Sequence, residues 1–292
     1  MQLDSLRVIV VGSAIGGCTT ALLLARAGAR VTLVERVAQP RAVGAGIAIA
    51  ANGQAVLDGL GLGPALADVP LVRQGRVVDG HGRVLLEPMR AMPPVRMMRR
   101  ATLATLLLDA VAAEPRITAV FGAEVLDASA DGALRVRTPQ GEVAMDADLV
   151  VAADGAHSTI RGRLGFGTRI GAEGIPYVRA LLPAGLAREE EAWTAAGIFG
   201  SFAVDDATYA YASAGTPPLR EAVATRDLDA FRAAWAAAYP ASQVLLAPLE
   251  RWDQLLLNTV VQVHCARWTV GRVTLLGDAA HAMAPNLGQG AN

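Results

Sequence analysis

Hydrophobic residues change their spacing twice near the start of the chain. Residues 6–11 form a short apolar run rich in β-branched side chains, which predicts a strand of a parallel sheet buried on both faces. Residues 15–27 then repeat with a helical period that stops at Gly28, and residues 31–34 form a second apolar run. Strand, glycine turn, helix and strand together predict a right-handed, parallel βαβ unit.

The next part of the chain predicts two helices and several short strands. The helices are expected at about residues 53–60 and 101–113, the second with an apolar stripe made of Leu103, Leu106, Leu107 and Val111. Four strand-like runs follow, at 117–121, 124–128, 134–138 and 142–145, and the turn signals Asp131-Gly132 and Gln140-Gly141 lie between them. We expect these four to form a small antiparallel ribbon. Residues 149–153 then predict a strand that returns to the parallel sheet.

The segment from about residue 171 to residue 248 alternates differently. Its pattern predicts strands of an open sheet at 177–182, 197–204 and 207–214, and an Ala-rich amphipathic helix at 227–238. One more apolar strand is expected at 273–276. The sequence has no internal repeat and no low-complexity linker, so we expect an α/β protein with two interleaved domains. The first domain covers residues 1–170 and 249–292. The second domain covers residues 171–248 and includes part of 71–99.

Amino-acid composition and net charge exclude some classes of function. The chain has 292 residues, of which 53% are hydrophobic and 18% charged, so it can fold on its own core without disulfides or metal. Lys plus Arg number 26 against 27 Asp plus Glu, which leaves no excess charge to attract nucleic acid. Cys18 and Cys265 lie far apart and predict no structural disulfide, which is typical of a reducing cytoplasm.

One uncharged stretch imitates a membrane segment. Charged residues are absent between Arg7 and Arg26, and an apolar run with a positive flank is also typical of signal peptides and membrane spans. Gly12, Gly16 and Gly17 interrupt this run at a turn. We therefore expect no membrane span.

The glycine turn itself predicts a nucleotide site. A dinucleotide pyrophosphate requires a tight turn, close approach of the backbone and the N-terminus of a helix, which here begins at Ile15. Gly12 and Gly17 occupy the first and third glycine positions of the fingerprint, whereas Ala14 replaces the second. Glu35 ends the second strand, where a carboxylate can bind both hydroxyls of an adenosine ribose. This motif leaves NAD and FAD open.

Three later segments carry a family resemblance. Residues 148–158 with Arg161, residues 271–281 and residues 286–292 resemble the signature segments of the FAD-dependent aromatic hydroxylase superfamily. Residues 44–47 and 100–103 extend the likeness over the whole chain, and the middle segment is the least distinctive part. The resemblance implies a Rossmann-like FAD-binding domain interleaved with an open-sheet substrate domain.

The resemblance also implies which residues contact the cofactor. Asp278 would accept hydrogen bonds from the flavin ribityl chain, Arg100 would hold the ribityl-phosphate region, and the Val125 backbone would lie near the adenine. Asp154 and Gly155 would serve both FAD and the reduced nicotinamide cofactor. The complete expected set is Gly12, Ala14, Ile15, Gly17, Glu35, Arg36, Arg100, Val125, Asp154, Gly155, Gly277, Asp278, Pro285, Gly288, Gly290, Ala291 and Asn292. Pro285 and the residues from Gly288 to Asn292 would lie against the isoalloxazine ring.

The implied reaction is oxygen transfer. NADH or NADPH would reduce bound FAD, O2 would react at flavin C4a, and one oxygen atom would pass to an aromatic or other unsaturated small molecule. The residues identify no catalytic base. His81, His157, His264 and His281 are too scattered for a zinc or iron site, so we expect no metal. His281 is expected to serve as a structural hydrogen-bonding residue.

Two alternatives stay open at this point. The first is a flavin enzyme of the same fold with another activity, such as a halogenase or a ring reductase. The second is a non-catalytic or truncated FAD- or ligand-binding module, which Ala14 favours. The second alternative also follows from the end of the chain at Asn292, where the family continues with a helix.

Overall fold

The computed structural model describes residues 3–40, 45–72, 75–87, 94–171 and 174–283. The chain divides into two compact units. The first unit comprises residues 1–42, 101–173 and 261–291, and the second comprises residues 43–100 and 174–260, with residue 292.

A six-stranded sheet forms the centre of the first unit. Its strands lie in the order β20 (Thr269–Val270), β21 (Val273–Leu275), β12 (Leu149–Ala152), β1 (Arg7–Val11), β2 (Arg30–Glu35) and β8 (Ile117–Phe121). All neighbours are parallel except β20 and β21. The predicted βαβ unit is confirmed, since α1 (Ile15–Arg26) connects β1 to β2 and Gly28, at φ 106°, follows its end. Parallel pairing buries β1 on both faces, which explains its continuous apolar run.

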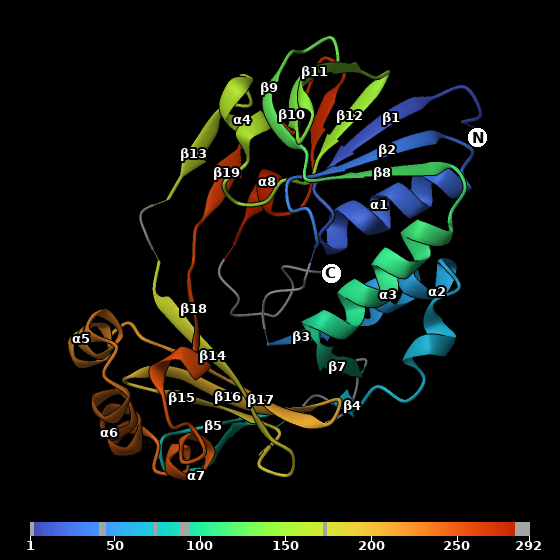
Figure 1. Cartoon of the computed structure of the whole chain (residues 1–292). Helices are drawn as coiled ribbons and strands as arrows, with labels where there is room; N and C mark the ends of the chain where they lie inside the picture. Colours follow the sequence, from blue (N-terminus) through green and yellow to red (C-terminus); the bar gives the residue numbers. More distant parts are fainter. Residues whose placement is uncertain (1–2, 41–44, 73–74, 88–93, 172–173, 284–292) are drawn as a thin grey trace. The chain divides into compact units, whose positions relative to one another are not determined.

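Two different layers cover this sheet. Figure 1 shows α1 and α3 (Arg100–Ala113) on one face and the three-stranded antiparallel sheet of β9 (Glu124–Ala128), β10 (Ala133–Thr138) and β11 (Gly141–Asp146) on the other. On that second face the core packs Val125 and Val136 against the sheet residues Val11 and Val150. The short helix α4 (Thr159–Arg163), the pair β13 (Thr168–Ile170) and β19 (Val263–Cys265), and the single turn α8 (Asp278–His281) complete the unit.

The prediction for residues 117–121 was wrong in one respect. These residues form a strand with the predicted bounds, but β8 pairs in parallel with β2, with Val31 opposite Ile117, and does not join the antiparallel ribbon. Gly122, at φ 71°, turns the chain between β8 and β9. Sequence spacing identifies a strand, whereas its partner depends on tertiary packing.

A seven-stranded sheet forms the centre of the second unit. Its order is β18 (Leu256–Thr259), β14 (Pro176–Pro183), β17 (Ala207–Ser213), β16 (Gly197–Val204), β15 (Glu190–Thr194), β5 (Arg76–Val78) and β6 (Val84–Leu86). The predicted strands at 177–182, 197–204 and 207–214 are confirmed as β14, β16 and β17. A second, three-stranded sheet contains β3 (Gly46–Ile49), β7 (Val95–Arg99) and β4 (Leu71–Val72).

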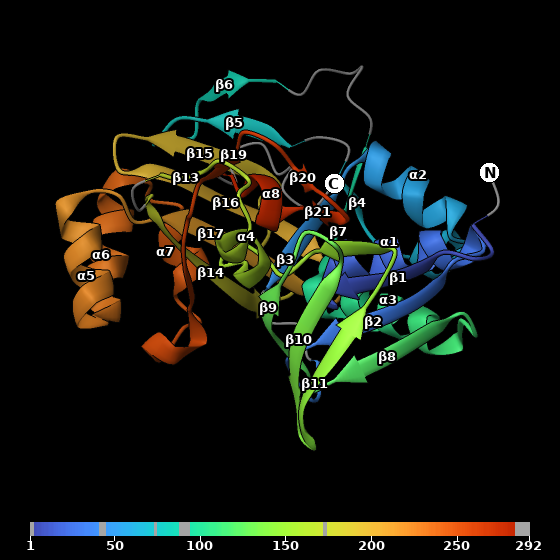
Figure 2. The same cartoon turned by 90° about the horizontal axis from the view of Figure 1, so that it is seen from above.

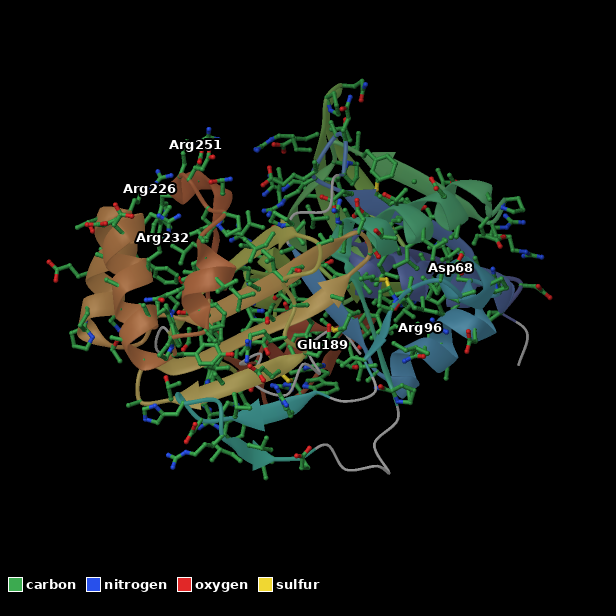
Figure 3. The ribbon with its side chains drawn as sticks, turned by 90° about the horizontal axis from the view of Figure 1, so that it is seen from below. Asp68, Arg96, Glu189, Arg226, Arg232 and Arg251 are labelled. Carbon is green, nitrogen blue, oxygen red and sulfur yellow. The ribbon has the colours of Figure 1, made fainter. Side chains whose placement is uncertain are left out.

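Helices gather beside the seven-stranded sheet. They are α5 (Pro217–Thr225), α6 (Leu228–Ala238) and α7 (Ser242–Leu246), which Figure 2 shows next to one another. The Asp227 side chain caps α6 by accepting from Ala230 N at 2.9 Å, which explains why the predicted helix begins there. Trp235 packs its ring edge-to-face on Phe199, with centroids 5.2 Å apart. Arg232, labelled in Figure 3, donates to the backbone oxygens of Leu246 and Leu249 and so joins α6 to the end of α7.

The remaining elements of the second unit are α2 (Ala51–Gly59) and two 3-10 turns, η1 (Gly63–Leu66) and η2 (Trp252–Gln254). Arg96 on β7 donates to Leu66 O at 2.6 Å, and so ties the end of η1 to the sheet. Across the described residues of both units, none of the helices is long and apolar enough to cross a membrane.

One buried carboxylate connects three elements of the second unit. The side chain of Glu190 is 1% exposed and accepts from Arg76 Nε at 2.8 Å, Arg188 Nε at 2.5 Å and Tyr239 OH at 2.6 Å. Burial by itself raises the pKa of Glu190, but the hydrogen bonds from Tyr239, Arg188 and Arg76 outweigh it and hold that pKa below its usual value. The carboxylate is therefore charged in the folded protein at neutral pH.

Replacing Glu190 with Gln is expected to cost about 3 kcal/mol of unfolding free energy at pH 7, because two guanidinium groups lose their buried partner. Because the pKa of Glu190 is lower in the folded protein, its contribution to stability is fully present above the unfolded pKa of about 4.5 and is lost as pH falls through the folded value. The difference between wild type and Glu190→Gln in urea melts should therefore shrink below about pH 4. Glu142→Gln, at a carboxylate 45% exposed, is the control and should change stability little at either pH. A constant difference from pH 7 to pH 3 would contradict this account.

Candidate functional site

The candidate site lies at the carboxyl edge of the parallel sheet in the first unit. Strands β1, β2, β12 and β21 run in the same direction, so the residues at and just beyond their carboxyl ends meet at one edge. These residues include Gly12, Glu35, Asp154 and Gly277. Open α/β sheets bind ligands at this edge.

The turn after β1 has room for backbone only. Gly12 has φ 101°, and a Cβ placed on it would lie 2.4 Å from Ala153 O. A Cβ on Gly17 would lie 1.8 Å from Gly12 O. Both distances are far inside van der Waals contact, so these two glycines allow the strand-to-helix turn to close. The contact with Ala153 also fixes the turn against the end of β12.

Ala14 occupies a position that does not require glycine in this backbone. It is the N-cap of α1, with φ −73° and ψ −177°, an extended conformation open to any residue. The first bond within the helix runs from Cys18 N to Ala14 O at 2.9 Å. The preceding N–H groups, which begin at Ile15, have no partner within the helix and carry the positive end of its dipole. The alanine thus preserves an N-terminus that suits an anion.

Glu35 at the end of β2 closes onto the same turn. Its Oε2 accepts from Ser13 N at 2.8 Å and from Ser13 Oγ at 3.0 Å, and its Oε1 accepts from Val37 N at 2.9 Å. Cys18 donates its thiol to Ser13 O at 3.1 Å from within the buried face of α1. Both cysteines, Cys18 and Cys265, are free and buried.

Asp154 follows β12 and has one satisfied and one open oxygen. Its Oδ2 accepts from Ile160 N at 3.3 Å, at the start of α4. Its Oδ1 is buried and has no hydrogen-bond partner in the part of the chain that the structure describes. A buried carboxylate oxygen without a donor is costly, so this atom is suited to accept from a ligand. Gly155 adopts φ 81° and turns the chain away directly after it.

Arg161 joins the two segments that contain Asp154 and Asp278. Its side chain is buried within α4, donates from Nη1 to Ala279 O at 2.9 Å and donates from Nη2 to Ala156 O at 2.6 Å. The first acceptor lies in α8 and the second in the turn after Asp154. Sequence reasoning used Arg161 only as a signature residue and missed this connecting role, which depends on contacts far apart in the chain.

Gly277 and Asp278 start the single turn α8. Gly277 is the N-cap, at φ 58°, and Asp278 is the first helical residue, with an exposed side chain. The Asp278 carboxylate is therefore accessible at the carboxyl end of β21. His281 packs its ring against Trp268, with centroids 5.0 Å apart, and its expected structural hydrogen bond stays a prediction.

Comparisons with known proteins identify the family. A family model described as FAD binding domain matches residues 5–292. The chain is 33% identical over 317 residues to the 2-heptyl-3-hydroxy-4(1H)-quinolone synthase of Mycobacteroides abscessus, covering 96% of this chain and 76% of that protein. It is 31% identical over 333 residues to the kynurenine 3-monooxygenase of Salinispora arenicola, covering 98% of this chain and 69% of that protein. The chain belongs to the FAD-dependent aromatic hydroxylase family of monooxygenases.

Solved structures agree with this assignment. The tetrameric form of 2-methyl-3-hydroxypyridine-5-carboxylic acid oxygenase matches with a TM-score of 0.83 at 26% identity, and the match covers 99% of this chain and 79% of that chain. These matches confirm the mixed α/β fold of the family. The glycine turn alone did not distinguish NAD from FAD, and the family match identifies FAD as the cofactor. The protein is an oxidoreductase of the flavin monooxygenase type.

The residues of this hydroxylase fit FAD on two independent observations. Gly12 and Gly17 allow the tight turn that brings the free N–H groups at the start of α1 to the sheet edge, and the open Oδ1 of Asp154 needs a donor. A diphosphate suits the first and a polyol hydroxyl suits the second. The helix start at Ile15, Glu35 and Asp278 lie at the same sheet edge.

For the other residues that are expected to contact FAD, the structure gives their positions but does not test their roles. Arg36 is exposed directly after β2. Arg100 begins α3, is exposed and donates its backbone N–H to Ala45 O at 2.9 Å. Val125 is buried in the core of the first unit, so its expected contact involves its backbone alone. Their roles toward FAD stay predictions, and Pro285, Gly288, Gly290, Ala291 and Asn292 lie outside the described residues. The described residues contain no cluster of side chains that could hold a metal ion.

Proposed function

We propose that this hydroxylase uses NADH or NADPH and O2 to insert one oxygen atom into a small aromatic or other unsaturated molecule. In this proposal the first unit is the FAD-binding domain and the second unit the substrate domain. The glycine turn carries the proposal, because Gly12 and Gly17 let the chain turn tightly enough to bring the start of α1 to the carboxyl edge of the sheet.

Each residue at the sheet edge has a distinct task in this proposal. The start of α1 binds the FAD diphosphate through its free N–H groups. Glu35 binds the adenosine ribose, and Asp154 and Asp278 accept hydrogen bonds from the ribityl hydroxyls. Arg161 keeps those two carboxylates in place by joining α4 to α8. Bound FAD supplies the electron transfer and the reaction with O2.

The substrate class is proposed from the relatives. Their names denote a quinolone synthase, a kynurenine 3-monooxygenase and a 3-amino-4-hydroxybenzoate 2-monooxygenase, the last 30% identical over 312 residues. We therefore propose an aromatic substrate with an amino or hydroxyl substituent, since these groups make a ring electron-rich.

Reduced-nicotinamide oxidation by the FAD-loaded chain tests this function. Oxidation of NADH or NADPH should rise when an amino- or hydroxy-substituted aromatic compound is added, with matching O2 consumption and a product one oxygen atom heavier. Gly17→Ala protein, treated with FAD in the same way, is the control and should show no stimulation. Stoichiometric FAD binding with no oxidation of either nucleotide by any such compound would support a non-catalytic FAD module instead.

A further inference from the structure

Ser13 makes three of its polar contacts within the candidate nucleotide site. Its backbone N–H and its hydroxyl both donate to Glu35 Oε2, at 2.8 Å and 3.0 Å. Its carbonyl accepts from the Cys18 thiol at 3.1 Å. The residue is 7% exposed, so these bonds are formed largely away from water. Ser13 is thus held by Glu35 through its two donors and by Cys18 through its carbonyl oxygen.

The contact with Cys18 is stable over a wide pH range. Burial, with a smaller contribution from the charge of Glu35, raises the pKa of the Cys18 thiol to about 12. The thiol therefore stays protonated at neutral pH and continues to donate to Ser13 O. This contact anchors Ser13 to α1, so that its hydroxyl points at Glu35 from a fixed backbone.

The hydrogen bonds that Glu35 accepts leave one lone-pair position on Oε1 for a ligand. An ionised carboxylate has about four lone-pair positions. Ser13 uses two positions on Oε2, and Val37 N uses one on Oε1, at 2.9 Å. The Ser13 hydroxyl is the single side-chain donor among these three, because the other two donors are backbone N–H groups. A fixed carboxylate binds a ligand with less loss of side-chain entropy than a rotating one.

We propose that Ser13 is a positioning residue that orients Glu35 toward the adenosine ribose of FAD. This inference rests on the proposed function, because it requires FAD in the glycine turn. Removing the hydroxyl leaves both backbone donors in place, so Glu35 keeps its place at the end of β2 but gains rotational freedom. The affinity for FAD should then fall while the fold is retained.

Direct FAD titration tests the proposal. FAD is added to the full chain after bound flavin has been removed, and the dissociation constant is read from the quenching of flavin fluorescence. Ser13→Ala should weaken FAD binding by roughly threefold to tenfold, the range of one ordinary hydrogen bond, because Glu35 keeps its two backbone donors. The same change in a Glu35→Gln background should weaken binding less than about twofold, because the oriented charge is already absent.

Matched variants separate positioning from general damage. Thr138→Ala removes another side-chain hydroxyl, which donates to Gly141 O at 2.9 Å in the hairpin between β10 and β11, and it should leave the dissociation constant unchanged. If Ser13→Ala does not fold, Ser13→Cys replaces it in the same cycle, because a thiol is a weak donor of similar size. An equal loss in both backgrounds would overturn the proposal, since it would indicate a merely structural role.

Failure of this inference can be distinguished from failure of the proposed function. If the wild-type chain binds FAD and Ser13→Ala leaves the dissociation constant unchanged, the inference alone is overturned. If the wild-type chain binds no FAD, the proposed function is overturned and this inference with it.

Discussion

Replacing Gly17 with alanine is expected to weaken FAD binding by on the order of 100-fold or more. The new Cβ would lie 1.8 Å from Gly12 O, so the turn must open and the start of α1 must move away from the diphosphate. Crowding of this kind also costs ~1–3 kcal/mol of unfolding free energy. Isothermal titration with FAD and urea melts measure the two effects separately.

The neighbouring Gly16 is the matched control for this prediction. A Cβ there would meet only the Leu276 side chain, at an ordinary 3.5 Å. Because alanine favours helices over glycine, Gly16→Ala should keep FAD binding within a few-fold and add about 0.5–1 kcal/mol of stability. Equal FAD affinity in Gly17→Ala and Gly16→Ala would show that the turn does not hold the diphosphate.

Replacing Arg161 with alanine is expected to lower the unfolding free energy by about 3 kcal/mol. Its buried guanidinium is the donor for Ala279 O and Ala156 O, and removal leaves both carbonyls without this partner and a gap between α4 and α8. Because Asp154 and Asp278 lie beside these two carbonyls in the chain, FAD binding should weaken by about tenfold as well. Chemical denaturation and FAD titration measure the two losses.

Arg163 on the same helix provides the comparison for Arg161. Its side chain is 55% exposed, and its Nε lies 3.8 Å from Asp127 Oδ1, so Arg163→Ala should change stability by less than about 0.5 kcal/mol. If both substitutions were equally mild, Arg161 would not connect the two segments as its hydrogen bonds indicate.

Local features of this fold could be predicted from the sequence, and pairings between distant segments could not. The helix 15–27 and the turn at Gly28 are encoded by neighbouring residues, and both are observed. The strand β15 was missed because Glu190 and Glu191 begin it. A buried Glu190 is tolerated because Arg76 and Tyr239 reach it from other elements and Arg188 reaches it from two residues before. That convergence leaves no trace in the spacing of residues.

The same contrast between local features and distant contacts holds for the candidate site. Gly12 and Gly17 could be recognised by their spacing, and the structure shows that added side chains would collide there. The departure at Ala14 could be recognised but not judged, because its acceptability depends on the extended backbone at the N-cap. The bond from Arg161 to Ala279 O joins residues 118 apart in the chain, and the open oxygen of Asp154 becomes visible only from its burial in the fold.

The visible absorption spectrum of the purified chain tests the central claim most directly, because bound flavin is yellow and the measurement requires no substrate. The claim is that the turn from Gly12 to Gly17, with Glu35, Asp154 and Asp278 around it, holds FAD. The account predicts a flavin spectrum corresponding to one FAD per chain after FAD is added and the excess is removed by gel filtration. A colourless chain that retains none of the added FAD would contradict it.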